Sequence, residues 1–66
     1  MNIELNGEKR ELTGNISLAD LVASLDMAGK RYAIEVNEEL IPRSEHADCQ
    51  LQENDKVEIV QAIGGG

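Results

Sequence analysis

The stretch of sequence that decides the fold is its last apolar run, Lys56-Val57-Glu58-Ile59-Val60-Gln61-Ala62-Ile63, which leads straight into three terminal glycines. An apolar run of this length predicts a strand that is held in place by its neighbours. Glycine has no Cβ and tolerates almost any φ, and three extended residues reach roughly 10 Å. The sequence therefore predicts a folded domain over residues 1–63 and a thin, flexible Gly-Gly-Gly tail over residues 64–66.

Working outward, the N-terminal residues predict a hairpin. Ile3 and Leu5 alternate with polar neighbours, which is the period-2 pattern of a half-buried strand. Asn6-Gly7 follows at once, and this dipeptide favours a type I′ turn because both of its residues accept positive φ. Residues 8–13 are then expected to return antiparallel, with Leu12 facing the core.

A helix is predicted next, with a well-marked start. Ser17 is a good N-cap, and Asp20 three residues later makes a capping-box-like arrangement. Gly29 is a plausible residue for the end of the helix. One apolar stripe at helical spacing follows the cap and consists of Leu18, Leu21, Val22 and Leu25.

The remaining segments are short. Residues 33–36 and 40–41 predict two strands around a polar turn, and residues 44–48 predict a single helical turn capped by Ser44. The order of elements predicts an α+β fold, a β-grasp (ubiquitin-like) roll with one main helix on a mixed four- to five-stranded sheet. The first and last strands would be parallel and central, because the helix supplies the long crossover. A ferredoxin-like fold needs a second helix, and an SH3-like barrel has no helix of this length. The expected core comprises Ile3, Leu5, Leu12, Leu18, Leu21, Val22, Leu25, Ile34, Val36, Leu51, Val57 and Ile59.

Composition narrows the class of partner. Thirteen acidic against six basic residues give a formal charge of −7, which disfavours nucleic acid and favours a partner protein with a basic docking face. No run approaches the ~20 apolar residues of a membrane span, and the N-terminus lacks the pattern of a signal peptide. A single cysteine suits a reducing cytoplasm. We expect a cytoplasmic protein that is monomeric when free.

The side chains predict no catalytic or metal site. His46 and Cys49 are the only soft ligands in the chain, and a metal would want three or four. We interpret both as structural residues. The C-terminus is then best interpreted as a substrate: activation of a carboxylate as an acyl-adenylate prepares it for attack by sulfur or by a lysine amine.

Several stretches together resemble the ThiS family of ubiquitin-like sulfur carriers. They are residues 1–7, residues 17–21, residues 33–37, residues 41–43 and the run from Asp55 to Gly66. The resemblance implies that a ThiF-like adenylyltransferase uses ATP to adenylate Gly66. Sulfur from a cysteine desulfurase would then convert the end to a thiocarboxylate, which a ThiG-like thiazole synthase uses in thiamine biosynthesis. The protein would be a co-substrate without a bound cofactor. Gly65 and Gly66 match the family's terminal pair, and Gly64 and Gly65 would thread into the partner.

The pleat predicts a docking surface beside the tail. If Val57 and Ile59 face the core, Glu58, Val60 and Ala62 face the other side, together with Glu35 of the neighbouring strand. Four other functions remain open. They are the small subunit of molybdopterin synthase (usually longer, with an additional helical segment), a sulfur carrier for another pathway, a ubiquitin-like protein modifier and an interaction domain with an inert tail.

Overall fold

In the computed structural model, which describes residues 1–27 and 29–61, the first hairpin turns at Asn6-Gly7 as predicted. Both residues have positive φ, 51° and 83°, as a type I′ turn requires. The paired strand ends two residues earlier than expected, at Glu11, although Leu12 still packs against the core. The Asn6 side chain also accepts a hydrogen bond from the backbone N–H of Ile59 at 2.8 Å, so the turn holds the final strand as well.

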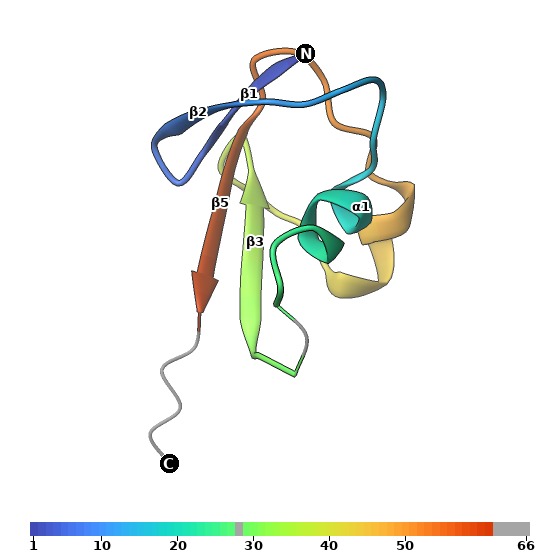
Figure 1. Ribbon diagram of the computed structural model, residues 1–66. Helices are drawn as coiled ribbons and strands as arrows, with labels where there is room; N and C mark the ends of the chain where they lie inside the picture. The colour runs from blue at the N-terminus through green and yellow to red at the C-terminus, as the bar shows by residue number, and fades with distance from the viewer. Residues whose placement is uncertain (28, 62–66) are drawn as a thin grey trace.

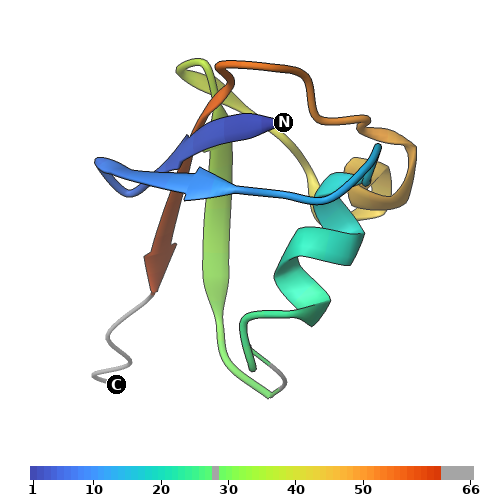
Figure 2. The ribbon, with the colours of Figure 1, turned by 45° about the horizontal axis from the view of Figure 1, so that its top comes forward.

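Five strands form one mixed sheet with one α-helix on one side, so the predicted fold class is confirmed (Figures 1 and 2). The strand order is β2-β1-β5-β3-β4. β1 and β5 are parallel, and β5 is the central strand, antiparallel to β3. The elements are, in chain order, β1 (Asn2–Leu5), β2 (Glu8–Glu11), α1 (Leu18–Ala23), β3 (Tyr32–Val36), β4 (Glu39–Leu40), the 3-10 helix η1 (Arg43–Asp48) and β5 (Lys56–Gln61).

Helix α1 begins as predicted and ends earlier. Its capping box is complete: the Ser17 Oγ accepts from the Asp20 N–H, and the Asp20 carboxylate accepts from the Ser17 N–H, each at 3.1 Å. The prediction that Gly29 ends the helix was wrong, because α1 ends at Ala23. Leu25 lies beyond the helix but still packs against the core, as the apolar stripe predicted. The Ser24 hydroxyl donates to the Leu21 carbonyl at 2.6 Å and competes with the helical backbone pattern. Helix α1 therefore comprises only six residues.

The short elements of the second half also differ from the prediction in detail. Asn37 and Glu38 make the turn between β3 and β4, with φ of 52° and 70°. Ser44 does not cap the following helical turn, because η1 begins one residue earlier, after Pro42. The fixed φ of Pro42, −61°, sets the chain in extended geometry immediately before the helix.

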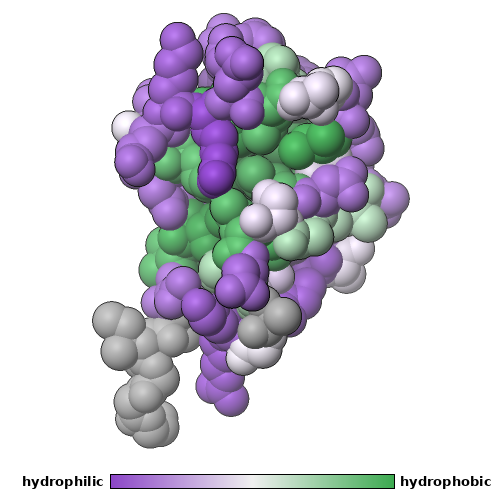
Figure 3. Space-filling model, viewed as in Figure 1, coloured by the Kyte–Doolittle hydropathy of each residue, from purple (hydrophilic) through white to green (hydrophobic). Residues whose placement is uncertain are grey.

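The core lies between the sheet and the two helices. Eight of the twelve predicted core residues are buried, and Leu5, Leu12, Leu25 and Ile59 are half-buried against them. Met27 was missed and is 8% exposed, which places it in the core after the helix has ended. On the face seen in Figure 3, apolar surface is visible between polar margins.

No helix within the described ranges is both long and apolar enough to cross a membrane. Residues 62–66 lie outside the described residues, so the expected boundary between a domain of 1–63 and a tail of 64–66 stays a prediction.

Candidate functional site

The face of the sheet that points away from α1 carries a small apolar and acidic patch. β3 and β5 pair so that Ala33 lies opposite Val60, and Glu35 lies opposite Glu58. β3 and β4 pair so that Glu35 also lies opposite Leu40. We call these five residues the outer-face patch.

The pleat explains why this patch is exposed. Val57 is 1% exposed on the core side, and alternate residues of a strand point to opposite faces. Val60 therefore points outward with 61% of its side chain exposed. The predicted orientation of Glu58 and Val60 is thus confirmed, as is that of Glu35, which is half-buried. Ala62, the fourth residue of the predicted surface, lies outside the described residues.

Leu40 is the member of the outer-face patch that sequence reasoning missed. It is 61% exposed, and with Val60 it is one of the two large hydrophobic side chains exposed in the described part of the chain. Sequence spacing offers no signal here, because β4 has only two residues. In the structure Ile41 packs against the core, and its neighbour Leu40 points to the other face. An exposed leucine alone is unremarkable, but its position across β3 from Glu58 extends the patch over three strands.

One strand pairing and one side-chain hydrogen bond fix the end of β5 against the rest of the domain. Gln61 pairs with Tyr32 in the sheet. The Gln61 side-chain amide also donates to the Met27 Sδ at 3.7 Å, a contact between β5 and the segment that follows α1. Gln61, the last described residue of β5, therefore has a defined position. Gly64, Gly65 and Gly66, the predicted tail residues, lie outside the described residues.

His46 has a structural role, as interpreted from the sequence, although it is more deeply placed than a loop residue. It is 6% exposed, and its Nε2 lies 3.0 Å from the Ile41 carbonyl oxygen. A carbonyl can only accept, so Nε2 carries the hydrogen. The His46 ring also stacks on Tyr32, with centroids 6.3 Å apart.

Cys49 is chemically quiet in this setting. Burial raises the pKa of its thiol above the ordinary value, and the nearby Asp55, Glu39 and Glu45 carboxylates raise it further. The thiolate is the reactive form of cysteine, so this environment lowers its nucleophilicity at neutral pH. Over residues 1–27 and 29–61, no three His, Cys, Asp or Glu side chains gather as a metal site would need.

The ThiS family model matches residues 3–66, which is nearly the whole chain and includes the terminal glycines. The chain belongs to the ThiS family.

Relatives of the ThiS family carry similar sequences in chains of different length. The sulfur carrier protein ThiS of Bacillus subtilis is 34% identical over 67 residues, which cover 97% of this chain and 98% of that protein. A thiazole synthase of Paramagnetospirillum magneticum is 35% identical over 66 residues, which cover all of this chain and 20% of that protein. The chain thus spans about a fifth of the length of the thiazole synthases that it matches.

A solved structure of a ThiS family member has the same fold. The crystal structure of the thiamine biosynthesis protein ThiS from Geobacter metallireducens superposes with a TM-score of 0.85 at 26% identity, and the match covers both chains completely. The match supports the order of strands described above for the ThiS fold.

Proposed function

We propose that this protein is a sulfur carrier for thiamine biosynthesis and that its C-terminal glycine, Gly66, carries the sulfur. The observation that supports this most directly is the extent of the family match, which runs to Gly66 and so includes the glycines at the end. The pKa of the Cys49 thiol is raised, which disfavours this side chain as the group that carries the sulfur. In this proposal the carrier is a co-substrate, and its partners perform the catalysis.

The chemistry requires activation because a carboxylate is a poor electrophile. A Gly66 carboxylate oxygen attacks the α-phosphorus of ATP on a ThiF-like adenylyltransferase, and pyrophosphate leaves. The terminal sulfur of a persulfide, supplied by a cysteine desulfurase, attacks the acyl-adenylate carbonyl and displaces AMP. A thiol then reduces the resulting acyl disulfide and releases the thiocarboxylate. Gly64 and Gly65 have no side chain and suit a narrow channel to that active site.

The sulfur would then pass to a ThiG-like thiazole synthase. Two chains named thiazole synthase contain a segment similar to this whole protein, at 35% and 36% identity. Because those thiazole synthases contain a carrier-like segment in the same polypeptide, we propose that this separate carrier supplies sulfur to such an enzyme.

The outer-face patch is the surface that we propose for docking to the activating enzyme. Leu40 and Val60 offer apolar contact area, and Glu35 and Glu58 offer negative charge between them. On a chain with a formal charge of −7, this arrangement suits an enzyme face with basic residues around an apolar centre. The patch includes the strand that leads to the tail, so docking there would aim Gly66 at the enzyme.

The decisive experiment combines ATP–pyrophosphate exchange with mass spectrometry. We expect the purified chain to support exchange with the adenylyltransferase, and expect sulfide or persulfide to replace one oxygen of the C-terminal peptide with sulfur. Oxidation of Met1, Met27 or Cys49 gives nearly the same mass, so the change must be located by peptide mapping. A mass gain that maps to Cys49, or conjugation of Gly66 to lysine amines in place of thiocarboxylate formation, would contradict the proposal.

A further inference from the structure

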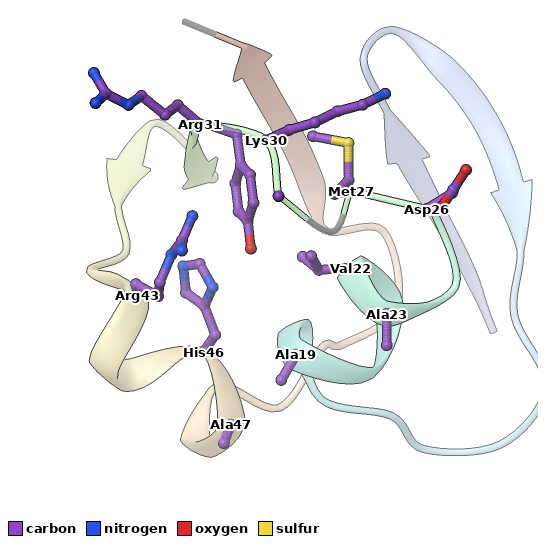
Figure 4. Close-up of a pocket in the computed structure, with 12 residues that line it drawn as sticks. Ala19, Val22, Ala23, Asp26, Met27, Lys30, Arg31, Arg43, His46 and Ala47 are labelled. Carbon is purple, nitrogen blue, oxygen red and sulfur yellow. The ribbon is translucent and has the colours of Figure 1, made fainter.

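A second candidate binding site lies on the opposite side of the sheet from the outer-face patch. A cavity of about 800 Å³ is bounded by α1, η1, the segment after α1 and the start of β3 (Figure 4). Its apolar lining includes Val22 and Met27, both buried, and the small side chains of Ala19 and Ala47. This lining offers space and apolar contact for one or two side chains of a ligand.

Stacked rings and a cation form one wall of the cavity. The Arg43 guanidinium carbon lies 4.5 Å from the centroid of the Tyr32 ring, and His46 stacks on the same tyrosine at an interplanar angle of 24°. His46 is fixed in turn by its hydrogen bond to the Ile41 carbonyl. Arg43 is therefore positioned before any ligand arrives, which lowers the entropic cost of binding.

The charge of the cavity is opposite to that of the protein. Lys30, Arg31 and Arg43 line it with Asp26 as their one acidic neighbour, so its lining carries a formal charge of +2. Three of the six basic residues in the chain gather here, whereas twelve of the thirteen acidic residues lie elsewhere. Such a local reversal on an acidic protein marks a place for a negatively charged ligand.

The directions of the cationic side chains indicate the shape of that ligand. In Figure 4, Lys30 and Arg31 extend to opposite sides of the cavity, and Arg43 stands beside His46 on a third side. They do not converge on one point, so a compact anion such as phosphate could engage only one of them. Separate carboxylates along an extended chain could engage all three, while an apolar side chain between them enters the cavity.

We propose that this cavity binds an acidic segment of a partner protein, with one apolar side chain against Val22 and Met27 and carboxylates on Lys30, Arg31 and Arg43. The site is distinct from the outer-face patch. Tyr32 alternates with Ala33 along β3 and so lies on the α1 side, whereas Ala33 belongs to the other face. The inference does not rest on the chemistry of Gly66, and its test needs neither ATP nor an activating enzyme.

The test is an amide-resolved NMR titration of the whole chain with blocked peptides. The first peptide is Asp-Glu-Leu-Asp-Glu, and its neutral counterpart is Asn-Gln-Leu-Asn-Gln. A third peptide has glycine in place of leucine, and inorganic phosphate alone is the fourth ligand. We expect the acidic leucine peptide to shift the amides of Met27, Lys30, Tyr32 and Ala47 at millimolar concentration and low salt. The neutral and glycine peptides should shift them less, and phosphate should not reproduce the pattern.

Variants then separate a site from general attraction. We expect Lys30→Gln and Arg43→Gln each to weaken binding of the acidic peptide by up to about fivefold, the range of a partly exposed ion pair. Lys9→Gln, on β2 and outside this cavity, removes the same charge and should leave binding unchanged. Because Arg43 also stacks on Tyr32, Lys30→Gln serves as the variant that leaves the ring stack intact.

Each contrary result overturns the proposal. Equal shifts with the neutral peptide would show that the charges do not contribute to binding. Equal binding of the glycine peptide would show that the apolar lining at Val22 and Met27 does not contribute. The same pattern with phosphate alone would replace a peptide site by a simple anion site. No shift among the cavity amides, or an equal loss in Lys9→Gln, would leave only general attraction or none.

Discussion

Glu35 of β3 and Glu58 of β5 lie directly opposite each other in the antiparallel pair at the centre of the outer face. Like charges in this position destabilise a sheet by up to about 1 kcal/mol. The fold would be more stable with one of them neutral. A negative pair that opposes folding is understandable where a basic partner surface compensates it on docking.

The first prediction concerns that pair. Glu58→Gln should raise the free energy of unfolding by a few tenths of a kcal/mol, and should slow association with the proposed activating enzyme because it removes a steering charge. Stopped-flow association and denaturant unfolding measure the two effects. Glu58→Lys should slow association more and leave the domain folded. Raising salt should slow association of the wild type more than it speeds dissociation.

Glu11→Gln on β2 is the matched control, since Glu11 is exposed and lies opposite Asn2 rather than another acid. It should change neither stability nor the association rate appreciably. An association rate that is insensitive to salt and equal for Glu58→Gln and the wild type would refute electrostatic docking through this face.

The second prediction separates core from surface. Leu21 is fully buried, so Leu21→Ala should cost roughly 2–5 kcal/mol of unfolding free energy, a large part of the stability of so small a domain. Leu40→Ala removes the same atoms from a side chain that is 61% exposed and should change stability by at most about 0.5 kcal/mol. It should nevertheless weaken docking to the proposed activating enzyme. Chemical denaturation measures the stability of both variants, and equilibrium binding measures the docking of Leu40→Ala. Similar stability losses in the two variants would contradict the core assignment.

The third prediction concerns reach and width at the C-terminus. Deleting Gly66 still leaves a Gly-Gly end, so this variant tests length alone, and it withdraws the reacting carbonyl by about 3.5 Å. Adenylation should be lost, because a misplacement of even ~1 Å can cost a hundredfold in rate. Gly65→Val keeps the length and should block entry through width. Pyrophosphate exchange measures both variants.

The melting temperature serves as the control for these two variants, because we expect both to melt like the wild type. Normal adenylation of the shortened chain would show that reach does not control the reaction.

The fourth prediction uses the raised pKa of Cys49. Its alkylation by iodoacetamide should be slow at neutral pH, and the midpoint of the pH profile should lie above that of an ordinary thiol. The folded state holds the thiol proton more tightly than the unfolded chain does. The contribution of Cys49 to the free energy of unfolding is therefore fully present at a pH below the pKa of the unfolded chain, and it is lost as the pH rises through the pKa of the folded state. In denaturant the alkylation profile should shift to lower pH; identical profiles in both states would contradict the effect of burial.

The sequence was most informative where local chemistry and apolar spacing agree. Asn6-Gly7 and the Ser17–Asp20 capping box each depend on a few adjacent residues, and both are present as predicted. The end of α1 was not predictable in this way. The spacing of apolar residues does not show that the Ser24 hydroxyl competes for the backbone carbonyl of Leu21. Burial of Met27 depends on the path of the chain after that early end.

Only part of the candidate site could be read from the sequence. Glu58 and Val60 follow from strand period, whereas Leu40 joins them through a two-residue strand too short to show a pattern. The cavity could not be predicted at all. Lys30 precedes β3 and Arg43 follows it in the sequence, and only the tertiary fold brings both to the lining of one cavity.

The position of β5 between β1 and β3 has a consequence for how the molecule is made. Residues 56–61 are the last of the sheet to leave the ribosome, yet both halves of the sheet depend on them. A nascent chain that has reached only residue 55 can close its two hairpins but cannot join them, and it exposes an unpaired edge on each. Pairing of β1 with β5 also joins the two most distant strands along the described chain, a kind of contact that slows folding. Folding of the whole sheet must therefore follow synthesis of β5, and a chain that stops before it would be exposed to proteolysis.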